Sequence, residues 1–102
     1  MDISEIRNKC NDESIEMTQH VLVRFQQRRI SYAEVKEIVL SGEIIEDYPD
    51  DYPYPSCLMF GKTAAGRVLH VVVGLSETSL WIVTAYEPSP AKWSEDFRHR
   101  KE

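Results

Sequence analysis

The chain has 102 residues, of which 42% are hydrophobic and 28% are charged, and its formal net charge is −5. These totals predict one small globular domain with enough apolar side chains for a core, and the acidic balance argues against nucleic acid as a partner. The apolar runs are too short to span a bilayer, and Asp2 and Glu5 stand where an export signal would begin, so we expect a cytoplasmic protein with no membrane attachment.

The first predicted element is a short helix over residues 3–11, because Ile3, Ile6 and Cys10 recur at helical spacing. An Asn-Asp-Glu-Ser run then predicts a turn, so residues 1–17 form an N-terminal helix and turn ahead of the main domain. Cys57 is the one other cysteine of the sequence. Since the two show no metal-ligand spacing, we expect small apolar residues, with no disulfide, no metal and no cofactor.

Residues 19–28 are predicted to form the first long helix, with Thr18 as its N-cap. Helical periodicity gives it an apolar face that consists of Val21, Leu22 and Phe25. Beside that face runs a polar stripe at four-residue spacing, made of His20, Arg24 and Arg28. The stripe has two interpretations: a set of phosphate-binding groups, or a helix cap with exposed ion pairs that stabilise the fold little.

The next helix begins at Ser31, because the run Ser31-Tyr32-Ala33-Glu34 fits the capping box, in which the serine hydroxyl and the glutamate carboxylate each bond the other's backbone N–H. Apolar residues continue the helical pattern through Val39. Gly42 then predicts a C-terminal cap with left-handed backbone geometry.

Four strands follow, the first with the weakest pattern, over residues 43–48, 57–61, 67–74 and 80–86. The connections are short, and short connections favour antiparallel pairing. We therefore expect an α+β fold in which two or three N-terminal helices pack on one face of a four-stranded antiparallel sheet. This domain covers residues 18–93, with Trp93 as an anchor for the C-terminus, and residues 94–102 form a charged C-terminal tail.

One histidine interrupts an otherwise apolar strand, in the run Val68-Leu69-His70-Val71-Val72-Val73. Side chains alternate between the two faces of a strand. If the helices cover the face of Leu69 and Val71, His70 lies on the opposite face, which one layer of helices leaves open. The alternative is a buried histidine that is hydrogen-bonded to a backbone carbonyl.

Tyr86 and Thr84 share one face of the last strand, and the hairpin register decides whether His70 is on it too. A pairing whose residue numbers sum to an even value unites the three side chains, and an odd sum separates them. The sequence leaves both registers open.

The loop between the first two strands contains three tyrosine–proline pairs, Tyr48-Pro49, Tyr52-Pro53 and Tyr54-Pro55. Each proline fixes its own φ and biases the preceding tyrosine toward extended geometry. The loop is therefore stiff for its length. Its phenols have two interpretations: platforms on which nucleic-acid bases stack, or a cover for one end of the sheet.

Several segments taken in order resemble a family of small bacterial and archaeal proteins, domain of unknown function 4258. They are His20-x-x-x-Arg24-x-x-x-Arg28-x-Ile30-Ser31, Gly42-Glu43-Ile44-Ile45-Glu46, Tyr52-Pro53-Tyr54-Pro55-Ser56, Gly66-Arg67-Val68-Leu69-His70-Val71-Val72, Ile82-Val83-Thr84-Ala85-Tyr86-Glu87-Pro88 and Lys92-Trp93. Arg29 departs from the pattern, since relatives often have glycine there. Either the helix ends differently here, or Arg29 adds a phosphate contact.

The resemblance implies a RelE-like arrangement, similar to the RelE, barnase and colicin group of nucleases that cut RNA without a metal. Such proteins are often toxins of toxin–antitoxin systems, so the expected partners are RNA or the ribosome and a zinc-finger, helix-turn-helix antitoxin. The expected function is therefore a metal-independent endoribonuclease, or mRNA interferase, that works by attack of the 2′-hydroxyl on the phosphate.

That chemistry requires a base, an acid and cations that hold the phosphate. Histidine and arginine suit these tasks by pKa and by shape. The candidate catalytic residues are His70, His20, Arg24, Arg28 and Tyr86. The candidate RNA contacts are Arg29, Arg67, Thr84 and Lys92.

A different class of function is equally compatible with the charge pattern. A non-catalytic RelE-like binding module would hold a protein partner or RNA without cutting it. The acids of residues 43–51 and the net charge of −5 favour this alternative, because a basic partner would bind there.

Overall fold

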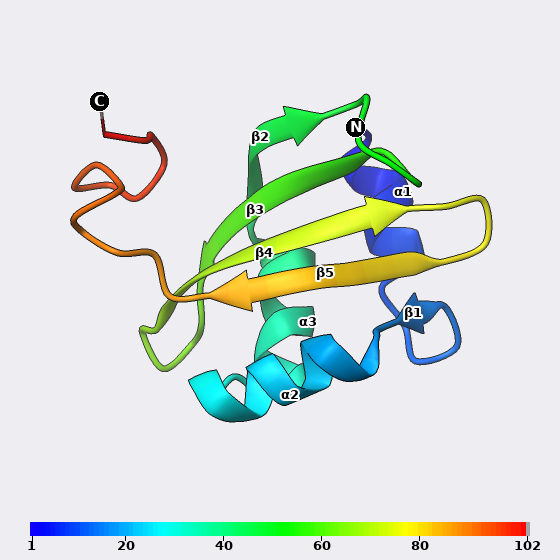
Figure 1. Cartoon of the computed structure of the whole chain (residues 1–102), viewed down its shortest axis with the longest axis horizontal. Helices are drawn as coiled ribbons and strands as arrows, with labels where there is room; N and C mark the ends of the chain where they lie inside the picture. The colour runs from blue at the N-terminus through cyan, green and yellow to red at the C-terminus, as the bar shows by residue number, and fades with distance from the viewer. Residues whose placement is uncertain (102) are drawn as a thin grey trace.

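The computed structural model describes residues 1–101, and within this range the chain forms three helices and five strands (Figure 1). In chain order the elements are α1 (Ile3–Asn8), β1 (Ile15–Glu16), α2 (Gln19–Arg28), α3 (Tyr32–Ser41), β2 (Glu43–Tyr48), β3 (Ser56–Lys62), β4 (Val68–Leu75) and β5 (Leu80–Tyr86). The α+β class is as expected. Among residues 1–101, no helix has the length and apolar character that crossing a bilayer requires.

The capping residues predicted from the sequence begin the two longer helices. The Thr18 hydroxyl accepts a hydrogen bond from the Val21 backbone N–H, so α2 begins at the predicted position. At α3, the Ser31 hydroxyl accepts from the Glu34 N–H at 3.1 Å, and the Glu34 carboxylate accepts from the Ser31 N–H at 2.9 Å. The predicted capping box is therefore confirmed.

α1 is shorter than the helix predicted over residues 3–11. The side-chain oxygen of Asn11 accepts hydrogen bonds from the backbone N–H groups of Glu13 and Ser14, at 3.1 and 3.0 Å. Asparagine stabilises turns in this way. The turn begins earlier than the apolar spacing indicates, and the helix ends at Asn8.

α2 ends at Arg28, and its C-cap residue Arg29 has a left-handed backbone with φ 55° and ψ 41°. The next N–H, of Ile30, then donates to the Phe25 carbonyl at 2.9 Å, as in the helix end that glycine normally forms. Glycine adopts this left-handed geometry easily, whereas the arginine at this position adopts it at a conformational cost.

The predicted left-handed cap at Gly42 is wrong, because its backbone is extended, with φ −85° and ψ −167°. Glycine is required at this position because there is no room for a Cβ atom. A Cβ on Gly42 would lie 2.4 Å from the Phe60 carbonyl oxygen and 2.6 Å from that of Ile38. α3 therefore turns into β2 where three backbone segments approach closely.

The expectation of a four-stranded antiparallel sheet is also wrong, because the sheet has five strands in the order β1-β5-β4-β3-β2. β2 to β5 are antiparallel, but β1 pairs with β5 in parallel. β1 has two residues, too few to show strand periodicity in a sequence. β1 is held beside β5 by backbone hydrogen bonding, in which the Ser14 carbonyl accepts from the Leu80 N–H at 2.9 Å.

The helices cover one face of the sheet, as predicted, and form the core there. Leu69, Val71 and Val73 of β4 are fully buried in a cluster with side chains of all three helices. Leu22 was predicted in this core but is 43% exposed on α2.

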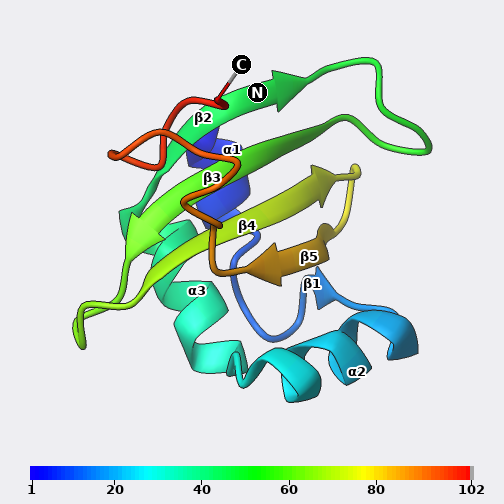
Figure 2. The same cartoon turned by 60° about the vertical axis from the view of Figure 1, so that its left-hand side comes forward.

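On the opposite face of the sheet, the C-terminal segment (residues 88–101) crosses β3 and β4 (Figure 2). Residue 102 of the predicted tail lies outside the described residues.

Replacing Arg29 with glycine should stabilise the protein, because glycine adopts a positive φ without the steric cost of a Cβ. We expect the R29G variant to gain roughly 0.5–1 kcal/mol in unfolding free energy, measured by urea denaturation. The matched control is Gln27→Gly, in the helical part of α2, which should lose about 1 kcal/mol. A loss of stability in R29G would contradict the proposed role of the left-handed position.

Candidate functional site

The strand register places three rows of side chains across the face that the helices leave uncovered. Residues paired directly across antiparallel strands share a face. The rows are Glu43-Phe60-His70-Tyr86, then Glu46-Leu58-Val72-Thr84, then Tyr48-Ser56-Gly74-Trp81. His70 pairs with Tyr86, so the numbers sum to an even value and His70, Thr84 and Tyr86 lie on one face.

His70 lies on the face predicted for it, yet its side chain is fully buried. Its Nε2 is 2.8 Å from the Phe97 carbonyl oxygen and its Nδ1 is 3.3 Å from the Tyr86 hydroxyl. A carbonyl can only accept, so Nε2 carries the hydrogen and donates. In the neutral ring Nδ1 then accepts from the tyrosine O–H. Both interpretations of the sequence thus apply in part: the ring faces away from the helices, and it is buried against a backbone carbonyl.

Burial favours the neutral forms of both rings. It lowers the pKa of His70, against the opposing effects of the Phe97 carbonyl and Glu46. Burial likewise raises the pKa of Tyr86, which is partly exposed at the end of β5. Near neutral pH the pair is therefore a neutral imidazole that accepts from a neutral phenol, an arrangement able to pass a proton inward.

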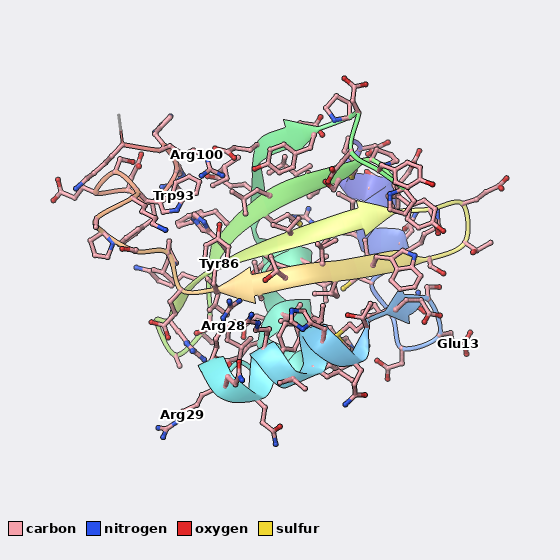
Figure 3. The ribbon with its side chains drawn as sticks, in the orientation of Figure 1. Glu13, Arg28, Arg29, Tyr86, Trp93 and Arg100 are labelled. Atoms are coloured by element: carbon pink, nitrogen blue, oxygen red, sulfur yellow. The ribbon has the colours of Figure 1, made fainter. Side chains whose placement is uncertain are left out.

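The C-terminal segment closes this site. The Trp93 ring packs edge-on against the His70 ring, with centroids 4.4 Å apart, and is 3% exposed. Arg100 lies over the Trp93 ring at 4.7 Å (Figure 3). Arg98 lies over the Phe60 ring at 4.4 Å and bonds Glu43. Trp93 thus anchors the chain end, as predicted, against the helix-free face.

Glu46 joins the segment to the opposite edge of the sheet. Its carboxylate accepts from the Arg100 Nε at 2.9 Å and also from the Tyr48 hydroxyl. Burial acts to raise the pKa of Glu46, but the Arg100 and Tyr48 hydrogen bonds outweigh it, and the pKa is lowered. The carboxylate is therefore charged, and it lies close enough to His70 to favour a proton there.

Sequence reasoning missed Glu46 and Arg100 as members of this site. A bulge in β2 between Ile44 and Glu46 reverses the alternation, so that Glu43 and Glu46 share the His70 face although they are three residues apart. No alternating pattern could have shown this. For Arg100 the basic chain end was a signal, but its position depends on the fold of the C-terminal segment.

Arg28 contacts the end of β5 from the side of α2. Its Nη1 donates to the Ala85 carbonyl at 2.9 Å and to the Thr84 hydroxyl at 3.2 Å. Figure 3 shows Arg28 between the end of α2 and Tyr86. The guanidinium therefore lies at the open end of the site, with further N–H groups that a bound anion could accept from.

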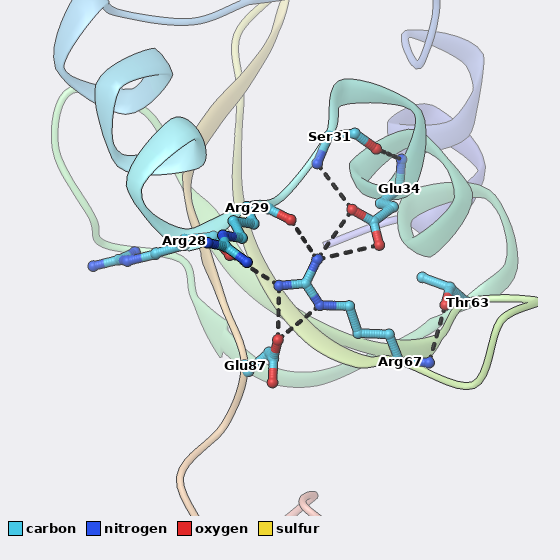
Figure 4. A network of polar contacts seen from close by, with 7 residues as sticks. All are labelled: Arg28, Arg29, Ser31, Glu34, Thr63, Arg67 and Glu87. Carbon is cyan, nitrogen blue, oxygen red and sulfur yellow. Dashed lines mark hydrogen bonds and ion pairs between the residues drawn. The ribbon is translucent and has the colours of Figure 1, made fainter.

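Arg67 has a different environment from the one expected of an RNA contact (Figure 4). Its guanidinium donates to the Arg28 and Arg29 carbonyls, at 2.9 and 2.6 Å, and pairs with Glu34 and Glu87, at 3.1 and 2.7 Å. These four partners engage all three nitrogens. A phosphate would have to displace one of them, so we leave Arg67 out of the proposed site. It caps α2 and ties that helix to α3 and to the end of β5.

The remaining predicted residues are spread over the surface. His20 and Arg24 are exposed on α2, and Arg29 is exposed just after it, with its side chain pointing away from the sheet (Figure 3). Lys92 is exposed in the C-terminal segment. Of the nine predicted residues, the structure brings together His70, Tyr86, Thr84 and Arg28.

Metal binding and thiol reactivity in the described part of the chain depend on its histidine, cysteine and acidic side chains. Residues 1–101 contain no group of three histidine, cysteine or acidic side chains arranged to hold a metal ion. Cys10 and Cys57 are buried free thiols, and burial raises the pKa of Cys57 to about 11. A thiol held protonated in this way is a poor nucleophile and metal ligand.

The fold and the site thus define an α+β protein with a histidine–tyrosine pair on the helix-free face of its sheet. A family model described as "Domain of unknown function (DUF4258)" matches residues 17–87, which is more than half of the chain, and the protein belongs to this family. No curated protein and no solved structure matches the chain. The evidence for a function therefore comes from the site itself.

Burial of neutral His70 predicts a pH-dependent stability. The folded pKa lies below the unfolded value of about 6.5, so the contribution is present above about pH 6.5 and is lost as the pH falls. His70→Gln keeps a donor for Phe97 but does not titrate. We expect the stability difference between wild type and this variant, from urea denaturation at several pH values, to shrink on acidification. A difference that is constant or grows on acidification would contradict the buried neutral ring.

Removing the Arg67 guanidinium should destabilise the fold. It would leave two helix-end carbonyls, the partly buried Glu34 carboxylate and the exposed Glu87 carboxylate without this donor, so we expect Arg67→Ala to lose about 1–3 kcal/mol of unfolding free energy. Lys36→Ala is the control, because it loses an exposed ion pair with Asp12 and should change stability by at most about 1 kcal/mol. Equal effects in denaturant titrations would show that Arg67 is an ordinary surface residue.

Proposed function

We propose that the protein is a metal-independent endoribonuclease of the RelE-like toxin type, with Tyr86, His70 and Arg28 as its catalytic group. The observation that carries the proposal is the 3.3 Å contact between the Tyr86 hydroxyl and His70 Nδ1 at the strand end that Arg28 also contacts. A partly exposed phenol backed by an imidazole, beside a guanidinium, combines a proton acceptor with a phosphate ligand.

In the proposed reaction the ribose 2′-oxygen attacks the adjacent phosphorus and the P–O5′ bond breaks. The 2′-hydroxyl proton passes to the Tyr86 oxygen as the Tyr86 proton passes to His70 Nδ1. The Phe97 carbonyl, which accepts from Nε2, stabilises the imidazolium that forms. The 5′-oxygen then takes the proton back through Tyr86, which leaves a 2′,3′-cyclic phosphate and a 5′-hydroxyl.

Arg28 would stabilise the charge of the phosphorane. A guanidinium can donate to two phosphate oxygens at once. Arg28 is held in position by Thr84 and the Ala85 carbonyl. In this scheme His70, whose ring has no exposed surface, acts on RNA only through Tyr86.

One observation favours a second candidate, a non-catalytic binding module. His70 is closed in by Trp93 and Phe97, and the acidic strand β2 already binds the chain's own Arg98 and Arg100. A basic partner segment could bind β2 in place of the C-terminal segment, and this binding would require no catalysis.

We also propose a protein partner for the endoribonuclease toxin. It is the partner that the family resemblance implies, a zinc-finger, helix-turn-helix antitoxin.

The test is RNA cleavage by the purified chain in the presence of a chelator, with the product ends analysed by mass spectrometry. We expect 2′,3′-cyclic phosphate ends from wild type and a rate roughly 10²–10⁴-fold lower for Tyr86→Phe, which loses only the hydroxyl. Arg28→Lys should also slow cleavage, because an ammonium cannot donate in the same two-point geometry.

Tyr32→Phe is the matched control, since it removes a phenol that is hydrogen-bonded to Asp12 outside the site. It should cleave at the wild-type rate. Full activity of the Tyr86→Phe variant would contradict the proposed mechanism. RNA left intact by folded wild-type protein would exclude the nuclease and leave the binding module.

A further inference from the structure

A second feature of the helix-free face lies at the far end of β5 from Tyr86. It is a groove of about 480 Å³ between the start of α2, the β2–β3 loop and β5. We call it the aromatic groove, and its principal lining residues are His20, Asp51, Tyr52, Tyr54, Trp81 and Val83. None of them belongs to the Tyr86 site.

The groove exposes apolar surface that the fold does not need to expose. Tyr52 is 91% exposed, Val83 48% and Tyr54 38%. The Tyr54 and Trp81 rings are nearly parallel, with 17° between their planes. Gly74 adds to the opening, since a Cβ there would meet its first neighbour, Trp81 Cβ, only at 3.7 Å. Flat, exposed aromatic rings held by a proline-rich loop suit the stacking of a planar ligand.

The charge around the groove indicates the kind of planar ligand. His20 lines the groove, and Arg24 and Arg28 follow it at four-residue intervals along α2 toward Tyr86. At 1.5 Å per helical residue this stripe is about 12 Å long. A row of that length with two guanidinium groups, and with aromatic rings at its other end, suits the binding of the backbone and bases of a single strand.

The opposite wall of the groove carries a carboxylate. Asp51 accepts from the Ser56 hydroxyl through Oδ2 at 2.5 Å, which holds the side chain in place. A fixed carboxylate repels phosphate but accepts from the exocyclic amino group of a base such as cytosine. At the position of this amino group uracil has a carbonyl oxygen, which can only accept, so uracil offers the carboxylate the ring N3–H alone.

We propose that the aromatic groove binds one unstacked nucleobase with an exocyclic amino group, a few nucleotides from the phosphate at Arg28 on the same RNA strand. This inference rests on the proposed function, because it takes the ligand of the α2 stripe to be RNA. The groove then selects sequence, whereas the Tyr86 site, which contacts phosphate and ribose, does not.

The experiment measures binding of the full chain to tetracytidylate and tetrauridylate, both 2′-O-methylated so that neither can be cut. NMR reports the Trp81 indole and the His20 ring. We expect the cytidine probe to bind several-fold more tightly and to shift both signals. The double variant Tyr52→Leu/Tyr54→Leu should weaken it roughly ten-fold, and Asp51→Asn should remove the preference over uridine. Tyr32→Leu, the matched control, should bind as wild type.

The outcomes separate this inference from the proposed function. Cleavage by wild type together with unchanged binding by the groove variants would overturn the base site alone. Intact RNA together with groove-dependent binding would overturn the nuclease and support the base site. Probes that leave Trp81 and His20 unshifted overturn the inference and make a protein segment the next candidate occupant.

Discussion

The fold of the helix-free face depends on one buried imidazole. His70 stands in a strand of valines, and its ring has no exposed surface. A buried polar group without a partner would cost roughly 1–3 kcal/mol. The two partners come from distant parts of the chain, the Tyr86 hydroxyl on β5 and the Phe97 carbonyl in the C-terminal segment. The histidine therefore fixes where the chain end lies, and the chain end determines which parts of the sheet remain accessible.

Charge is divided between the two sides of this face. The basic side is α2, with His20, Arg24 and Arg28, and the acidic side is β2, with Glu43 and Glu46. The chain's own Arg98 and Arg100 pair with the acidic side. An anionic ligand would accordingly approach along α2, where the cations are exposed. This is how a protein of net charge −5 can present a basic surface.

Two irregularities of the sheet decide which residues form the site. The bulge in β2 turns Glu46 toward His70. A second register shift lies between β4 and β5, at Val72/Val73. Because of it, Thr84 and Tyr86 lie on the His70 face while Ile82 is part of the core. With regular alternation, Ile82 and Thr84 would share one face. Bulges near a candidate site are common because they redirect single side chains without altering the rest of the sheet.

Features that depend on neighbouring residues could be predicted from the order of the amino acids alone. Thr18 and Ser31 specify the helix starts because a cap needs only the next few backbone N–H groups. Alternation in β4 was enough to predict that His70 faces away from the helices.

Features that depend on distant residues could not be predicted in this way and became visible only in the folded chain. Strand β1, the even register of His70 with Tyr86, the engagement of Arg67 by four partners and the fold of residues 88–101 over the sheet all require contacts across the chain. Such contacts have no local period in the sequence, because the partners lie tens of residues apart and meet only when the core has formed.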